Sequence, residues 1–218
     1  MLKMSKILIL SACAVLIVAA SVLGTFAYLT SQDSVVNTFT VGKVNITLDE
    51  AAVNADGTEI AGADRVKENN YHLIPGQTYI KDPTMTVKAK SEESYVRMLL
   101  TLNCADEFDA IYTPDKADLT TIFNGYDAEN WVYETVTRDT AKNSITYEFR
   151  YKEVVTKSAT DTKLDALFDS ITVPSIFNSE DMKSIADLKI TIVGHAIQAI
   201  GFADADAAWT AFNEQIDG

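Results

Sequence analysis

The chain has 218 residues, of which 47% are hydrophobic and 22% are charged, and its formal net charge at pH 7 is −13. This length and composition predict one domain with a real core and exclude a chain that is disordered throughout. The excess of acidic residues argues against a protein that binds nucleic acid or anionic lipid by simple electrostatics.

The first segment has the layout of a secretory signal peptide. Two lysines supply a positive start, an apolar run continues to about Leu29, and the small residue Ala27 precedes Tyr28. We therefore expect a signal-peptide helix over residues 1–27, with cleavage between Ala27 and Tyr28, and a secreted protein. The alternative is a retained membrane anchor, because the apolar run is long enough to span a bilayer. Contact with a membrane would then occur only through this uncleaved leader.

Residues 28–41, directly behind the predicted cleavage site, form a candidate strand of their own. Val35, Phe39 and Val41 lie at odd positions, whereas the apolar residues that follow lie at even ones. A change of parity reverses which face of a strand is buried, so both sets cannot belong to one flat strand. Gly42, where the parity changes, is therefore a candidate hinge or bulge.

Alternation of apolar and polar residues is the dominant pattern of residues 42–218, and it predicts half-buried strands. Turn-forming sequences at residues 54–57, 75–76 and 124–125 separate these runs. The predicted strands cover residues 44–48, 85–89, 96–104, 145–151 and 188–197, and one more begins at Trp131 and Tyr133.

Three short helices are expected beside the strands. One covers residues 161–170, where apolar residues recur at helical spacing, and a second begins at Ser179. A third, capped by Asp204 or Asp206, carries an apolar stripe that we expect to pack on the sheets. Many short strands with few peripheral helices favour an all-β fold, in which residues 42–218 form a two-sheet antiparallel jelly-roll-like sandwich. The helical stripe consists of Trp209, Phe212 and Ile216.

Few residues suggest catalysis. The two histidines, His72 and His195, are far apart in sequence and neither lies in an H-E-x-x-H motif, so a zinc site would need folding to bring them to a carboxylate. Cys104 lies on the apolar face of its predicted strand and is interpreted as a core residue. No P-loop, dinucleotide-binding fingerprint or G-x-S-x-G motif is present. We therefore expect no catalytic, cofactor-binding or metal-binding residue.

Four segments resemble one group of exported bacterial proteins. The leader ends in Gly-Thr-Phe-Ala-Tyr-Leu-Thr at residues 24–30, and Asn-Thr-Phe-Thr-Val-Gly-Lys-Val follows at residues 37–44. The stretch around Pro75 and Gly76 is similar to the turn that these proteins carry before a core strand, and residues 188–212 are similar to their C-terminal end. The group is the TasA/camelysin family, whose members are matured by a SipW-type signal peptidase. Residues 105–174 carry no such resemblance.

The resemblance implies a structural subunit of extracellular matrix fibres in biofilms. In that family a strand freed at the N-terminus inserts into the sheet of the next subunit, where main-chain hydrogen bonds supply affinity and alternate side chains fill pockets. For this chain it implies residues 28–41 as the donor strand, with Val35, Phe39 and Val41 as the inserted side chains. The partners would be the signal peptidase, further copies of the chain in a head-to-tail homopolymer, and other matrix proteins. The alternative is that residues 28–41 are a frayed tail or an edge strand of their own sandwich.

Two other functions stay open at this point. Camelysin-like members have been labelled metalloproteases, so a secreted metal-dependent peptidase is one alternative. A monomeric sandwich that binds a surface polysaccharide is the other, and it would expose aromatic residues such as Trp131, Tyr133 and Tyr151 on one sheet face.

Overall fold

The structure is a computed structural model that describes residues 42–107 and 123–216. The expected leader, its cleavage residues Ala27 and Tyr28, and the candidate donor residues Val35, Phe39 and Val41 lie outside the described residues. The elements of the described part, in chain order, are β1 (Ile46–Asp49), β2 (Thr78–Ile80), β3 (Thr84–Val87), β4 (Ser94–Asn103), β5 (Phe123–Asn124), β6 (Trp131–Asp139), β7 (Ser144–Tyr151), β8 (Thr162–Lys163), β9 (Ser170–Thr172), α3 (Ser179–Ser184), β10 (Ile190–Gln198) and α4 (Ala205–Ile216).

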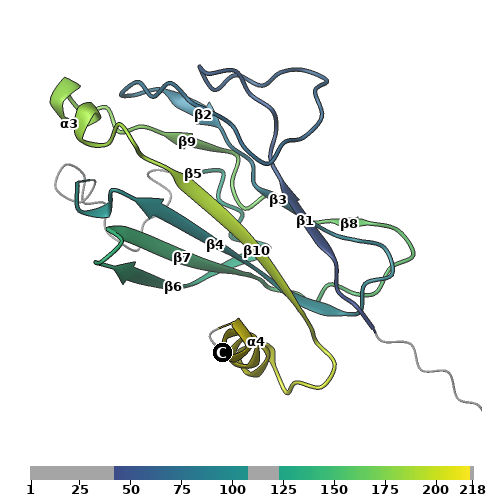
Figure 1. The fold of residues 1–218 in the computed structure, drawn as a ribbon. Coiled ribbons are helices and arrows are strands. Elements are labelled where there is room, and N and C mark those ends of the chain that lie inside the picture. Colours follow the sequence, from purple (N-terminus) through teal and green to yellow (C-terminus); the bar gives the residue numbers. More distant parts are fainter. Residues whose placement is uncertain (1–41, 108–122, 217–218) are drawn as a thin grey trace, which may run out of the picture. The chain divides into compact units, whose positions relative to one another are not determined.

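A four-stranded antiparallel sheet in the order β10-β4-β7-β6 forms one layer of the fold (Figure 1). Its long strands follow the predicted alternation: Leu100 of β4 lies opposite Ile192 of β10 and Tyr147 of β7. Because successive side chains of a strand point to opposite faces and paired residues on neighbouring strands share a face, the even-numbered residues of β4 line one apolar surface. That surface consists mainly of Val96, Met98, Leu100 and Leu102, all buried.

Two smaller antiparallel sheets, β1-β3-β8 and β2-β9-β5, cover this apolar surface (Figure 1). The close approach of the layers is visible at Gly194 of β10. A Cβ there would overlap Cε of Met85 on β3 and would lie 3.7 Å from Cδ1 of Ile46 on β1. A glycine at this position therefore lets β1 and β3 pack directly on β10.

The all-β fold with antiparallel sheets and few short helices, predicted from the sequence, is confirmed by the described residues. The helix predicted over residues 161–170 is wrong. Leu164, Leu167 and Phe168 are buried, but the chain around them follows the neighbouring strand: Leu164 N donates to Met85 O at 2.9 Å and Leu167 N to Pro83 O at 3.1 Å. Their spacing reflects a loop that contributes to the core, not a helical face.

The other helices are capped by local side chains. Asn178 Oδ1 accepts from the amides of Glu180 and Asp181 at the start of α3, so the predicted cap at Ser179 is one residue too late. Asp204 Oδ1 accepts from Ala207 N at 2.9 Å at the start of α4, so Asp204 is the cap of the two predicted candidates, while Asp206 lies within the helix. In the part of the chain that the structure describes, neither helix has the length and apolar character needed to cross a membrane.

Candidate functional site

Among the described strands, β10 lies at the edge of its sheet and pairs only with β4. Asn103 N donates to Lys189 O and Ala199 N to Glu93 O, so the odd-numbered residues of β10 exchange hydrogen bonds with β4. In an antiparallel pair the residues between these bond to the other side. The N–H and C=O groups of the even-numbered residues therefore point away from β4, and no described main-chain group bonds them. These residues are Ile190, Ile192, Gly194 and Ala196.

β1 leaves a shorter free edge on the same side of the fold. Lys88 N donates to Asn45 O at 2.9 Å, so the odd-numbered residues of β1 bond to β3 and the groups of Ile46 and Leu48 point outward. The next outward residue, Glu50, exchanges two hydrogen bonds of 2.8 Å with Val66. The loop after β1 thus closes the edge beyond Leu48.

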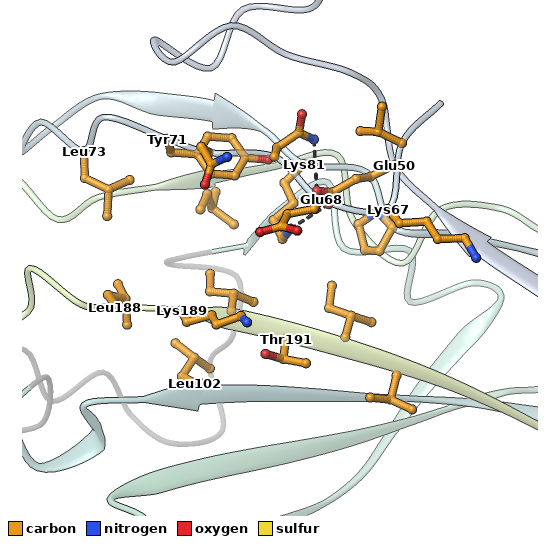
Figure 2. A pocket seen from close by; sticks show the side chains of 18 of the residues that line it. Glu50, Lys67, Glu68, Tyr71, Leu73, Lys81, Leu102, Leu188, Lys189 and Thr191 are labelled. Carbon is orange, nitrogen blue, oxygen red and sulfur yellow. Dashed lines mark hydrogen bonds and ion pairs between the residues drawn. The ribbon is translucent and has the colours of Figure 1, made fainter. Parts of the chain in front are cut away.

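A groove of about 890 Å³ lies between these two edges. Figure 2 shows Tyr71 and Leu73 on one wall and Leu102 and Leu188 on the other, with Lys189 and Thr191 beside them. Half-buried apolar side chains lie along its length, while charged side chains such as Lys67 and Glu68 lie at its rim. An apolar floor between unpaired main-chain edges is what an added strand requires. The apolar residues are Ile46, Leu48, Leu73, Leu188, Ile190 and Ile192.

A buried ion pair stiffens the wall formed by β1. Lys81 Nζ lies 2.6 Å from Glu50 Oε2, and both residues are buried (Figure 2). Asn69 Nδ2 donates to the other carboxylate oxygen of Glu50 at 2.9 Å and to Ala51 O at 2.8 Å. Because charges away from water are stable only when paired and hydrogen-bonded, this arrangement fixes the wall to the strands behind it.

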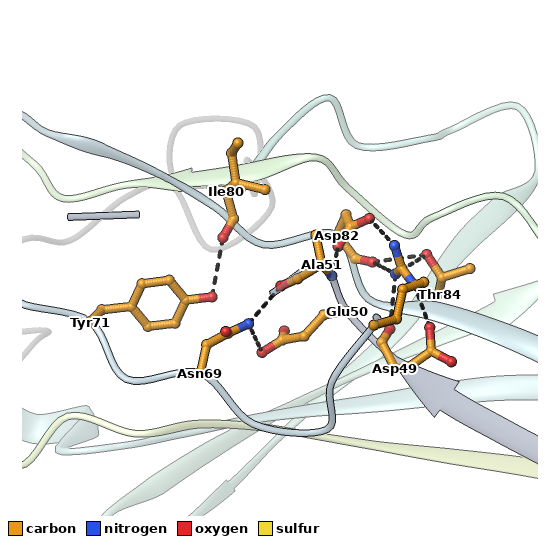
Figure 3. A network of polar contacts seen from close by, with 9 residues as sticks. Asp49, Glu50, Ala51, Asn69, Tyr71, Ile80, Asp82 and Thr84 are labelled. Atoms are coloured by element: carbon orange, nitrogen blue, oxygen red, sulfur yellow. Dashed lines mark hydrogen bonds and ion pairs between the residues drawn. The ribbon is translucent and has the colours of Figure 1, made fainter. Parts of the chain in front are cut away.

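Arg65 also anchors this wall, through hydrogen bonds to Asp49, Asp82 and Thr84, the three residues labelled together in Figure 3. Its guanidinium donates to the carboxylates of Asp49 and Asp82 and, at 2.9 Å, to Thr84 Oγ1. Burial lowers the pKa of Arg65, but the hydrogen bonds to the two aspartates raise it more, so the pKa lies above its ordinary value. The loop that carries Arg65 is therefore tied to β1 and β3 by a permanent positive charge.

The residues weighed as catalytic lie in separate surroundings. His72 is in the loop before β2, where its amide donates to Ala55 O. His195 lies on β10, where its Nδ1 accepts from Arg97 Nε at 3.2 Å and its ring packs on Phe212 of α4. Among the described residues, no group of three or more His, Cys, Asp or Glu side chains is arranged to hold a metal ion.

The structure corrects the expectation for Cys104 and locates the aromatic residues on which the polysaccharide-binding alternative depends. Cys104 does not continue β4: it follows the strand with a φ of 54° and is half-buried. Burial, with Glu107 and Asp187 nearby, raises the pKa of its thiol. Trp131 is only 1% exposed and therefore belongs to the core, while Tyr133 and Tyr151 are half-buried.

The groove itself was not predicted, although the strands that form it were. Alternation along residues 188–197 shows a strand, but only the pairing of that strand with its neighbours shows which edge stays free.

The scan against protein-family models and the searches of curated proteins and of solved structures found no match for this chain.

Proposed function

We propose that this chain is a secreted structural subunit of an extracellular matrix fibre, in which the N-terminal strand of one copy is added to the sheet of the next. The observation that carries the proposal is the groove between β1 and β10, where an apolar floor is flanked by two edges that no described strand pairs. The likeness of the leader and of residues 37–44 to the TasA/camelysin family supports it independently.

Residues 28–41 are the proposed occupant of the groove. Val35, Phe39 and Val41 lie on one face of an extended segment, together with Asn37, so this face can enter the apolar floor while the main chain pairs with β10. From Val35 to Val41 there are six residue steps, about 20 Å in an extended strand. The free edge of β10 from Ile190 to Ala196 has the same number of steps.

The proposal includes how the strand becomes available. A SipW-type signal peptidase cleaves between Ala27 and Tyr28. Gly42 is the hinge between the freed strand and the sandwich. The sandwich itself takes a jelly-roll-like arrangement. Gly42 is exposed, and a Cβ there would lie 2.8 Å from Cγ of Glu92, so the chain passes close to that side chain. The assembled product lies outside the cell as a homopolymer that other matrix proteins can join.

Neighbouring residues of β10 provide a matched test. Both border the groove, but successive side chains of a strand point to opposite faces: Ile192 shares a face with the buried residue Leu100 opposite it, whereas Val193 points to the other face and is already exposed. Ile192→Lys places a charge on the apolar floor, and we expect it to abolish fibres in electron micrographs. Val193→Lys adds the same charge on the solvent side, and we expect it to assemble normally. Fibres formed by Ile192→Lys at the wild-type level would contradict the proposal.

Removal of residues 28–41 tests the donor. The shortened protein is expected to keep its circular dichroism spectrum and to lose polymerisation, since the sandwich remains but nothing fills the next groove. Normal polymerisation after this deletion would show that another segment makes the contact.

The proposed role involves no catalytic step, cofactor or metal. Casein cleavage that is sensitive to chelators and lost on substitution of His72 or His195 would contradict this part of the proposal and favour a metal-dependent peptidase.

A further inference from the structure

Gly42, where the proposed donor strand joins the sandwich, lies at one end of the β-layers. Glu92 N donates to Lys43 O at 3.0 Å, and Ala199 N donates to Glu93 O at 2.7 Å. The start of the described chain, the turn before β4 and the turn after β10 therefore lie together, as Figure 1 shows. We name this group, residues 42–43, 92–93 and 199–201, the entry end.

Two neighbouring turns, one before β2 and one after β9, lie toward the opposite end of β10 (Figure 1). Gly76 N donates to Val173 O at 2.8 Å, and a Cβ on Gly76 would lie 3.6 Å from Cβ of Ser175. We name these turns, residues 74–77 and 174–177, the turn end. The groove reaches this end, because Leu73, Pro174 and Phe177 line it.

The direction of an added strand follows from the sheet that it joins. Every strand pair of the four-stranded sheet is antiparallel, and antiparallel ladders are slightly more stable per residue than parallel ones. β10 runs from the turn end to the entry end. A strand antiparallel to β10 therefore runs the other way, and its last residue emerges at the turn end of the acceptor.

No spacer separates the proposed donor strand from the sandwich, so the direction of the strand determines which ends of two copies meet. Val41, the last apolar residue of the proposed donor, is directly bonded to Gly42 in the sequence, and neighbouring Cα atoms are only about 3.8 Å apart. Resting on the proposed function, we infer that the entry end of one copy sits against the turn end of the next. The copies then meet through a second contact besides the inserted strand.

Exposed isoleucines lie at both ends that would meet. Ile200 at the entry end is 64% exposed, and Ile74 and Ile176 at the turn end are 46% and 60% exposed. Removal of apolar side chains from water favours association. Contact between the two ends removes these side chains from water in every junction of the fibre.

The same geometry separates a fibre from a closed pair. A contact between unlike ends is heterologous and continues from copy to copy, which produces a filament when it does not close into a ring. A strand parallel to β10 would emerge at the acceptor's entry end, so that like ends would meet and two copies could exchange strands in a closed dimer.

Cysteine crosslinking of the exported, processed protein distinguishes these arrangements. In a Cys104→Ala background, the double variant Ile176→Cys/Ile200→Cys is treated with a short bifunctional maleimide after fibres are confirmed by electron microscopy. We expect a ladder of covalent oligomers, because each copy contributes one cysteine to each of two junctions. The control, Val193→Cys/Ile200→Cys, has an exposed cysteine away from the turn end and is expected to give no ladder.

Each other outcome overturns a defined part of the inference. Covalent dimers from Ile200→Cys alone would show that like ends meet and would overturn the end-to-end contact while strand addition stands. Fibres of the Ile176→Cys/Ile200→Cys variant without a ladder would do the same. If the Cys104→Ala protein and the wild type both fail to form fibres, the proposed function fails together with the inference.

Discussion

The ion pair of Glu50 and Lys81 is the most enclosed charge interaction at the groove wall, with side chains only 9% and 7% exposed. Lys81→Met would leave the carboxylate of Glu50 buried with Asn69 as its partner. We expect the free energy of unfolding to fall by about 3 kcal/mol, because a buried charge without its counter-ion is costly. Chemical denaturation measures this change.

Lys88→Met is the matched control for that variant. Lys88 pairs with Asp161, but both side chains are far more exposed, at 40% and 46%. Solvent screens such pairs, so the expected loss is below about 1 kcal/mol. Equal losses in Lys81→Met and Lys88→Met would show that burial does not make the pair of Glu50 and Lys81 special.

Gly194 is a residue at which the layers approach closely. Gly194→Val would force its side chain into the space of Met85, and overfilling of a packed core destabilises proteins by about 1–3 kcal/mol. The double variant Gly194→Val/Met85→Ala relieves the overlap and is expected to be more stable than the sum of its single changes predicts. Thermal unfolding of the four proteins forms the cycle, and simple additivity would contradict direct packing of β3 on β10.

At the scale of elements, the buried side chain of Arg97 is one of the contacts that hold α4 to the outer face of the four-stranded sheet. The guanidinium of Arg97 lies 4.4 Å from the ring centre of Trp209 and 5.2 Å from that of Phe212, and its Nη2 donates to Asn213 Oδ1 at 2.6 Å. Trp209 is fully buried, so Trp209→Ala is expected to cost about 3–5 kcal/mol. Thr210→Ala, on the exposed side of α4, should stay within about 0.5 kcal/mol of the wild type in the same denaturation assay.

His195, which contacts Arg97 and Phe212, makes the stability of the fold depend on pH. Burial, followed by the positive charge of Arg97, lowers the pKa of His195 from its ordinary value of 6.5, against a smaller opposing effect of Glu148. The folded protein therefore binds the proton less readily than the unfolded chain. The contribution of His195 is full above about pH 6.5 and is lost as the pH falls below that value, until the folded-state pKa is passed.

Denaturation at several pH values checks this dependence. His195→Phe removes the titrating group while keeping a ring against Phe212, so the difference in unfolding free energy between wild type and variant should change between about pH 7 and pH 5. A difference that stays constant over this range would show that His195 does not titrate differently in the two states.

The sequence predicted those elements whose signal is local. α4 was found because its apolar stripe and the cap at Asp204 lie within a few residues of each other, and β4, β7 and β10 because alternation runs along each strand. The helix over residues 161–170 failed because Leu164 and Leu167 bond to β3 and the residue before it, some 80 residues earlier in the chain. The free edges of β1 and β10 depend on such distant pairings and were therefore beyond reach of the residue pattern alone.

At the scale of the whole molecule, the groove is expected to bind the donor segment as a separate peptide. A synthetic peptide of residues 28–41 is expected to bind the protein that lacks these residues and to stabilise it by about 2.7 kcal/mol at a hundredfold excess over its dissociation constant. A shift in thermal unfolding measures this effect. A peptide with lysine in place of Phe39 and Val41 is the control, and equal shifts from both peptides would contradict insertion of apolar side chains.

The hydrogen bonds between Glu50 and Val66 affect how the proposed fibre elongates. Because these bonds end the free edge of β1 at Leu48, only β10 offers a long free edge along the groove. The groove therefore accepts a single added strand. With one donor and one acceptor per copy, strand addition yields unbranched polymers whose tips differ, one bearing a vacant groove and the other a spare strand. Copies without residues 28–41 would then act as chain terminators at the tip that bears the spare strand, shortening the polymers even when they are a small minority.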